Sequence, residues 1–106
     1  MKILIVDDDN DNLNLLERLL IKYGHNVISA TNGTEALDKL RAEVCDLIIS
    51  DVLMPIMDGF KFCHEVKKSE KLQNIPFIFC TGTYTDEKDE DLALLTRQLI
   101  MINYTA

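Results

Sequence analysis

Short apolar runs of strand length recur along the chain, and segments with the spacing of a helix separate most of them. The strand-like runs are Ile3–Val6, Asn26–Ala30, Leu47–Ile49, Phe77–Cys80 and Leu99–Ile102. Most of them are apolar at every position instead of alternating with polar residues. A continuous apolar run is typical of a strand buried on both faces, and such strands form parallel sheets with helices on each side. This alternation therefore predicts an α/β fold.

The segments between the runs carry helical periodicity. Leu13, Leu16, Leu20 and Tyr23 share one helical face, and Gly24 follows at the position where glycine often ends a helix. Further helical stretches are expected at 33–42, at 59–68 and after the acidic residues at 86–91. Because crossovers between parallel strands are right-handed, few topologies remain. We predict one doubly wound domain with a five-stranded parallel sheet, spanning residues 1–106.

Composition excludes several classes of function. The 106 residues carry a net charge of −7, so we expect no direct contact with nucleic acid, which requires a basic face. A membrane-spanning helix needs about 20 apolar residues, and every apolar run in this sequence is much shorter. The N-terminus does not have the pattern of a signal peptide. We therefore expect a cytoplasmic domain that does not bind a membrane. The three cysteines and two histidines lack the spacing of a zinc site.

Polar residues follow three of the predicted strands directly. Asp7, Asp8 and Asp9 follow the first strand, Asp51 follows the third, and Thr81 follows the fourth. Ligands of open α/β sheets bind outside the carboxyl ends of the strands, so these side chains are expected to meet at one edge. Asp9 lies just before a helix and is interpreted as its N-cap.

Carboxylates gathered at one edge repel one another unless they are protonated or neutralised by a cation. A small set of hard oxygen ligands, completed by water, suits Mg²⁺ better than zinc. A carboxylate beside a bound Mg²⁺ can attack a phosphoryl group, and a hydroxyl on the next strand can bind a phosphoryl oxygen. The pattern thus predicts metal-dependent phosphoryl chemistry at this edge.

Three blocks of residues together resemble a response-regulator receiver (CheY-like) domain. The blocks are Ile3–Asp9, the highly specific Asp51–Gly59 (DVLMPIMDG) and Ile75–Gly82. The resemblance extends from residue 1 to about residue 95. It implies the strand order 2-1-3-4-5 and a role in a two-component phosphorelay. The domain would accept a phosphoryl group from a sensor histidine kinase or a phosphotransfer protein and would then switch conformation to signal.

The resemblance also implies roles for particular residues. Asp51 would be the phosphoacceptor, and Thr81 the switch hydroxyl. Asp8 would ligate Mg²⁺ directly and Asp7 through water, with the backbone carbonyl of Leu53 as a further ligand. Such a domain modifies itself, by autophosphorylation and autodephosphorylation at most, and is not an enzyme acting on a separate substrate. Its output domain or partner is not identified by these residues.

The C-terminal end departs from the family pattern. The family has a Lys-Pro pair after its fifth strand, whereas Asn103 and Tyr104 stand there in this sequence, which ends at Ala106. We therefore expect the fifth helix to be absent, either through truncation or in a degenerate receiver. Its absence would expose Leu99–Ile102, so we also expect a homodimer formed through this end.

Other functions were compared with this interpretation. A haloacid-dehalogenase-type phosphatase also uses an aspartyl nucleophile after its first strand, but this chain is too short for that family's downstream lysine and acid. A flavodoxin-type FMN site is disfavoured because three aspartates would repel the FMN phosphate. The alternative that stays open is a phosphorylation-independent interaction module with the receiver fold. The asparagine at the lysine position favours this alternative, and the intact set of aspartates opposes it.

Overall fold

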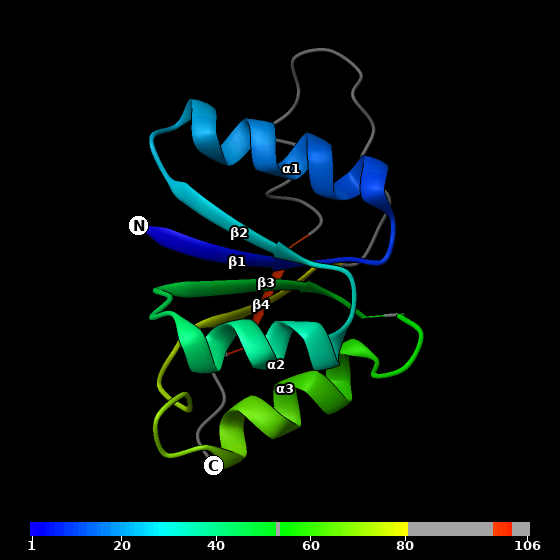
Figure 1. Ribbon diagram of the computed structural model, residues 1–106, viewed down its shortest axis with the longest axis vertical. Helices are drawn as coiled ribbons and strands as arrows, with labels where there is room; N and C mark the ends of the chain where they lie inside the picture. Colours follow the sequence, from blue (N-terminus) through cyan, green and yellow to red (C-terminus); the bar gives the residue numbers. More distant parts are fainter. Residues whose placement is uncertain (53, 81–98, 103–106) are drawn as a thin grey trace.

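Strands and helices alternate along the chain in the computed structural model, which describes residues 1–52, 54–80 and 99–102 (Figure 1). The strands are β1 (Lys2–Val6), β2 (Asn26–Ala30), β3 (Leu47–Asp51), β4 (Phe77–Cys80) and β5 (Leu99–Ile102). The helices are α1 (Asn10–Lys22), α2 (Gly33–Ala42) and α3 (Gly59–Lys68). Each lies where the sequence predicted it; β1 begins one residue earlier and β3 ends two residues later than expected.

The strands form one sheet with the order β2-β1-β3-β4-β5, as predicted. Strands β1 to β4 pair in parallel. Helix α1 covers one face of the sheet, and α2 and α3 cover the other (Figure 1). The doubly wound architecture is therefore confirmed.

Strand β5 departs from the prediction, because it pairs with β4 in the antiparallel direction. In this register Leu99 lies beside Cys80 and Ile102 beside Phe77, so no crossover is needed between the two strands. An apolar run reports burial but not direction, and antiparallel edge strands are common on otherwise parallel sheets. The side chains of β5, on which the expected homodimer depends, lie outside those described.

Residues of β1 explain why its apolar run is continuous. Leu4 and Val6 pack with α2 and α3, whereas Ile3 and Ile5 pack with α1 on the other face. All four side chains are buried. Since successive side chains of a strand point to opposite faces, only a strand covered on both sides buries every position.

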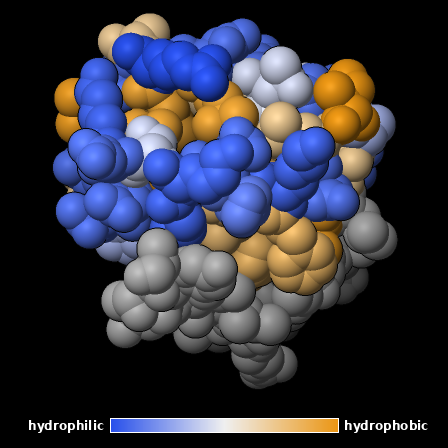
Figure 2. Space-filling view, turned by 90° about the horizontal axis from the view of Figure 1, so that it is seen from below, coloured by the Kyte–Doolittle hydropathy of each residue, from blue (hydrophilic) through white to orange (hydrophobic). Residues whose placement is uncertain are grey.

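The surface on the α3 side of the molecule is largely polar. Figure 2 shows the molecule from the α3 side, where hydrophilic side chains cover much of the described surface and apolar atoms appear between them. This is the pattern of amphipathic helices packed on a sheet. Among the described residues, the helices are too short and too polar for any of them to cross a membrane.

Candidate functional site

Three aspartates lie together at the carboxyl edge of the sheet. One carboxylate oxygen from each of Asp7, Asp8 and Asp51 lies within 4.8 Å of the other two. The register of the sheet produces this arrangement, because Val6 of β1 pairs with Ser50 of β3. The residues that follow these two positions leave neighbouring parallel strands at the same edge. The gathering predicted from sequence is therefore observed for these three aspartates.

Asp7 is the most enclosed of the three. Its side chain is buried, with the residue 7% exposed. Its Oδ1 accepts a hydrogen bond from the backbone N–H of Asp9 at 2.9 Å, and its Oδ2 accepts one from the Asn12 side-chain amide at 3.3 Å. Both carboxylate oxygens are thus held by the protein. Asp7 is fixed at the base of the cluster.

The pKa of Asp7 shows the electrostatic cost of this arrangement. Burial is the main cause that raises its pKa from 3.8 to about 6, and the negative charges of Asp51 and Asp8 raise it further. The hydrogen bonds from Asp9 and Asn12 act in the opposite direction. At neutral pH the cluster therefore holds carboxylates that repel one another, and a bound cation would remove this repulsion.

Asp8 and Asp51 are more accessible than Asp7. Asp8 is exposed, and Asp51 is half-buried at the end of β3. The Asp51 Oδ1 accepts a hydrogen bond from the backbone N–H of Val52 at 2.7 Å. A cation that arrives from solvent can thus reach carboxylate oxygens of both residues. Clustered carboxylate oxygens are the ligands preferred by Mg²⁺, so the described residues fit this ion.

The loop between β3 and α3 returns directly to Asp51. The Gly59 N–H donates to the Val52 carbonyl oxygen at 2.8 Å. A Cβ added to Gly59 would collide with the Asp51 carbonyl oxygen. Asp58 begins α3 as its N-cap, accepting a hydrogen bond from the Lys61 N–H at 2.8 Å. Glycine is required at residue 59 because two backbone segments meet there.

The same loop contains a left-handed residue that is not glycine. Ile56 has φ 70°, and the Met57 N–H donates across it to the Pro55 carbonyl oxygen at 2.7 Å. This is the hydrogen bond of a γ-turn, and a positive φ is unusual for a β-branched residue. Ile56 is also 81% exposed. The loop beside Asp51 therefore holds strain that its surroundings must maintain.

Other predicted residues have different outcomes. Asp9 caps α1, as expected, by accepting hydrogen bonds from the N–H groups of Asp11 and Asn12. Leu53, Thr81 and Asn103 lie outside the described residues, so their predicted roles stay predictions.

One residue of the site was missed by the sequence analysis. It is Asn12, which contacts Asp7. Asn12 could have been found, because it is a polar residue next to Leu13 on the apolar side of α1. The contact made by Gly59 depends on how the loop folds back, which the sequence pattern does not record.

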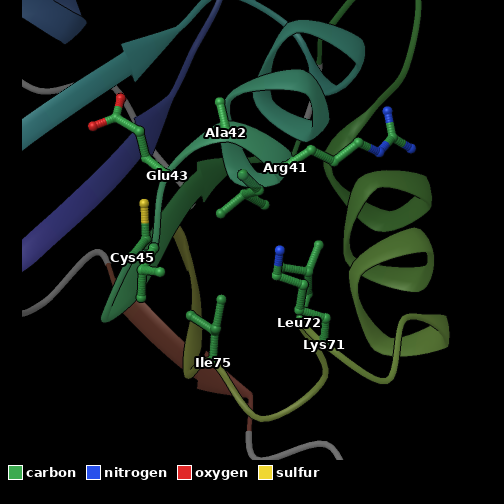
Figure 3. A pocket seen from close by; sticks show the side chains of 9 residues that line it. Arg41, Ala42, Glu43, Cys45, Lys71, Leu72 and Ile75 are labelled. Carbon is green, nitrogen blue, oxygen red and sulfur yellow. The ribbon is translucent and has the colours of Figure 1, made fainter.

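A separate pocket of about 180 Å³ lies at the opposite edge of the sheet, between the end of α2 and the segment before β4 (Figure 3). Arg41, Cys45, Lys71 and Ile75 are among its lining residues, and none of the three clustered aspartates belongs to it. The carboxylate cluster, not this pocket, combines the groups that can hold a cation.

The sequence matches the family model of the response regulator receiver domain over residues 3–97. It is 41% identical over 81 residues to the probable transcriptional regulator ycf27 of Porphyra purpurea. That match covers 76% of this chain and 32% of the regulator, so the chain spans about a third of that protein's length.

Solved structures show the same fold. One is the signal receiver domain of a signal transduction histidine kinase from Syntrophus aciditrophicus, with 31% identity and a TM-score of 0.77, covering 91% of this chain and 85% of that one. Another is the response regulator protein TrrA from Thermotoga maritima in complex with Mg²⁺-BeF. It has 26% identity and a TM-score of 0.74, covering 92% of this chain and 97% of that one.

Proposed function

Because the chain belongs to the response regulator receiver domain family, we propose that it receives a phosphoryl group on Asp51. The donor would be the phosphohistidine of a sensor histidine kinase or of a phosphotransfer protein. The observation that carries this proposal is the cluster of Asp7, Asp8 and Asp51, in which one carboxylate oxygen of each residue lies within 4.8 Å of the others. The phosphorylated domain would change conformation and signal to an output domain or a partner.

The surroundings of the aspartates support Asp51 as the acceptor in preference to Asp7. Asp7 is buried, and hydrogen bonds engage both of its oxygens. Asp51 is half-buried, at the point where β3 ends and the loop begins. A nucleophile must be reachable by a large donor, so Asp51 suits this role better.

The metal expected at this cluster is Mg²⁺. Asp8 and Asp51 would bind it directly together with the Leu53 backbone carbonyl, and Asp7 would act through water. The solved complex of TrrA with Mg²⁺-BeF supports a magnesium site in this chain as well. When bound, the ion would offset the repulsion between the carboxylates and the anionic phosphoryl donor.

The proposed transfer is a substitution at phosphorus. A carboxylate oxygen of Asp51 forms the new O–P bond as the N–P bond of the phosphohistidine breaks. The electron pair of the broken bond stays on the imidazole nitrogen, and the histidine is released. Thr81 would donate its hydroxyl hydrogen to a phosphoryl oxygen, as its place after β4 suggests. A small phosphodonor such as acetyl phosphate could replace phosphohistidine, which would make the reaction an autophosphorylation.

The test is phosphorylation with acetyl phosphate and Mg²⁺, followed by intact-mass spectrometry. We expect one phosphoryl group in the wild type and none in Asp51→Asn. Asp38→Asn is the matched control, since Asp38 is an exposed residue of α2 that pairs with Arg41 away from the cluster. Unchanged labelling of Asp51→Asn would refute the assignment. A wild type that binds neither Mg²⁺ nor phosphoryl group would favour a phosphorylation-independent module.

A further inference from the structure

We propose that Asn12 is a positioning residue of the metal site, whose side-chain amide orients the Asp7 carboxylate and so strengthens Mg²⁺ binding by the cluster. This inference rests on the proposed function above. It assigns a role to a residue of α1 that is not one of the acidic groups.

The two hydrogen bonds to Asp7 come from different directions. The Asn12 Nδ2 donates to Oδ2 at 3.3 Å, and the backbone N–H of Asp9 donates to Oδ1 at 2.9 Å. A single hydrogen bond would leave the carboxylate free to turn about its Cβ–Cγ bond. With one donor on each oxygen, the plane of the carboxylate is fixed. Helix α1, through Asn12, and the loop before it, through Asp9, thus jointly orient the Asp7 carboxylate.

The position of Asn12 in α1 supports a specific role. Asn12 is 9% exposed and lies beside the buried Leu13 near the start of the helix. A buried amide is unfavourable unless its donors are satisfied, and an apolar residue would avoid that cost. Here the amide reaches the most buried carboxylate of the cluster. Its place on the buried side of α1 is what allows the contact.

The chemistry of the amide suits a metal site. A lysine or arginine could also donate to Asp7, but its positive charge would compete with a cation for the carboxylates. The amide of Asn12 is neutral, so it fixes the carboxylate and leaves the negative charge of the cluster intact. Groups that orient metal-site carboxylates commonly change metal affinity by about 10–100-fold when they are removed.

The experiment compares the Mg²⁺ affinity of the wild type with that of three variants. The affinity is measured by ¹H–¹⁵N NMR titration. Asn12→Leu keeps a similar volume and removes the donor. Asn12→Ala removes the donor with a residue that favours helix, and it serves if the leucine variant does not fold. Asn14→Leu is the matched control, because Asn14 is an exposed residue of the same helix. Dispersed spectra without metal establish that each variant is folded.

We expect both Asn12 variants to bind Mg²⁺ about tenfold more weakly than the wild type, and Asn14→Leu to bind as the wild type does. A purely structural role would lower the stability of the Asn12 variants and leave their affinity unchanged, which would overturn the inference. A second readout needs no metal: the side-chain amide signals of Asn12 should shift in Asp7→Ala, and an absent shift would also overturn it. A wild type that does not bind Mg²⁺ at all would instead refute the proposed function.

Discussion

The backbone of Gly59 lies against the carbonyl oxygen of Asp51, so closely that a methyl group at residue 59 would overlap that oxygen. The first residue of α3 therefore defines where the end of β3 can lie. The Gly59 N–H also bonds the Val52 carbonyl oxygen at 2.8 Å, which closes the loop beside the aspartates. Any side chain at residue 59 must displace the backbone of Asp51.

The first prediction is that Gly59→Ala slows phosphorylation of Asp51 and lowers the free energy of unfolding by about 1–3 kcal/mol, the usual cost of overpacking. Gly24→Ala is the control: Gly24 has φ 89° but open space around its Cβ position. That variant should lose stability through backbone strain alone and keep the phosphorylation rate of the wild type. Acetyl phosphate kinetics and urea unfolding measure the two effects. Equal rates in wild type and Gly59→Ala would contradict the prediction.

The second prediction concerns the pH dependence of stability without metal. The folded protein holds the Asp7 proton up to a pKa of about 6, against 3.8 as the ordinary value. Between these values the folded state binds more protons than the unfolded state, so stability falls as the pH rises. At about 1.4 kcal/mol per pKa unit, the full loss attributable to Asp7 is about 3 kcal/mol. Asp7→Asn should remove this loss.

Urea unfolding in EDTA at about pH 4.5 and about pH 7.5 provides the measurement. The free energy of unfolding changes by some amount between the two pH values, and this change is compared between wild type and Asp7→Asn. The difference between the two proteins isolates the contribution of the Asp7 carboxyl. Asp11→Asn, at an exposed position in the first turn of α1, is the control. The idea fails if all three proteins lose the same stability between the two pH values.

The third prediction is that substitutions of Asp8 and Asp9 have opposite effects: one mainly weakens Mg²⁺ binding, and the other mainly lowers stability. Asp8→Ala should weaken Mg²⁺ binding by at least about tenfold, since it removes a group at the metal. Without metal it should slightly stabilise the fold, because one of the repelling charges is gone. Asp9→Ala should instead cost about 1 kcal/mol of stability through loss of the helix cap, with a smaller effect on affinity. Calorimetric titration and thermal unfolding test both halves, and equal Mg²⁺ affinity in wild type and Asp8→Ala would end this assignment.

The fourth prediction concerns a buried lysine away from the aspartates. Lys67 is 7% exposed, and its Nζ donates to the carbonyl oxygens of Gln73 at 3.0 Å and Ile75 at 3.2 Å. Lys67→Met leaves these carbonyls without that donor and should lower the free energy of unfolding by about 1–3 kcal/mol. Lys68→Met removes only an exposed ion pair with Glu65 and should cost less than about 1 kcal/mol. Urea denaturation measures the free energy of unfolding of both variants. Equal losses in the two variants would show that Lys67 is not needed to hold the segment from Gln73 to Ile75.

The sequence predicted those features that follow from periodicity and position. The continuous run Ile3–Val6 indicated a strand buried on both faces, and Asp7, Asp8 and Asp51 were placed correctly because parallel strands end at one edge. The direction of β5 was not predictable, since an apolar run has the same composition in either direction. The close approach of Gly59 to the Asp51 backbone depends on the path of the loop, which periodicity does not determine. Asn12 stood out in the sequence only as a polar residue on the apolar side of α1, and its partner Asp7 is seen only in the structure.

The register of β1 has a consequence for how the protein is made. This strand is an inner one, paired with β2 through Lys2 and Asn26 and with β3 through Ile3 and Leu47. Synthesis by the ribosome starts at the amino end, so β1 emerges well before the residues that complete its pairing on the β3 side. Until then its apolar side chains have no complete core to join, and such exposed strands are prone to aggregation. Chaperone contact during translation should therefore concentrate on the interval before Leu47 to Asp51 leave the ribosome.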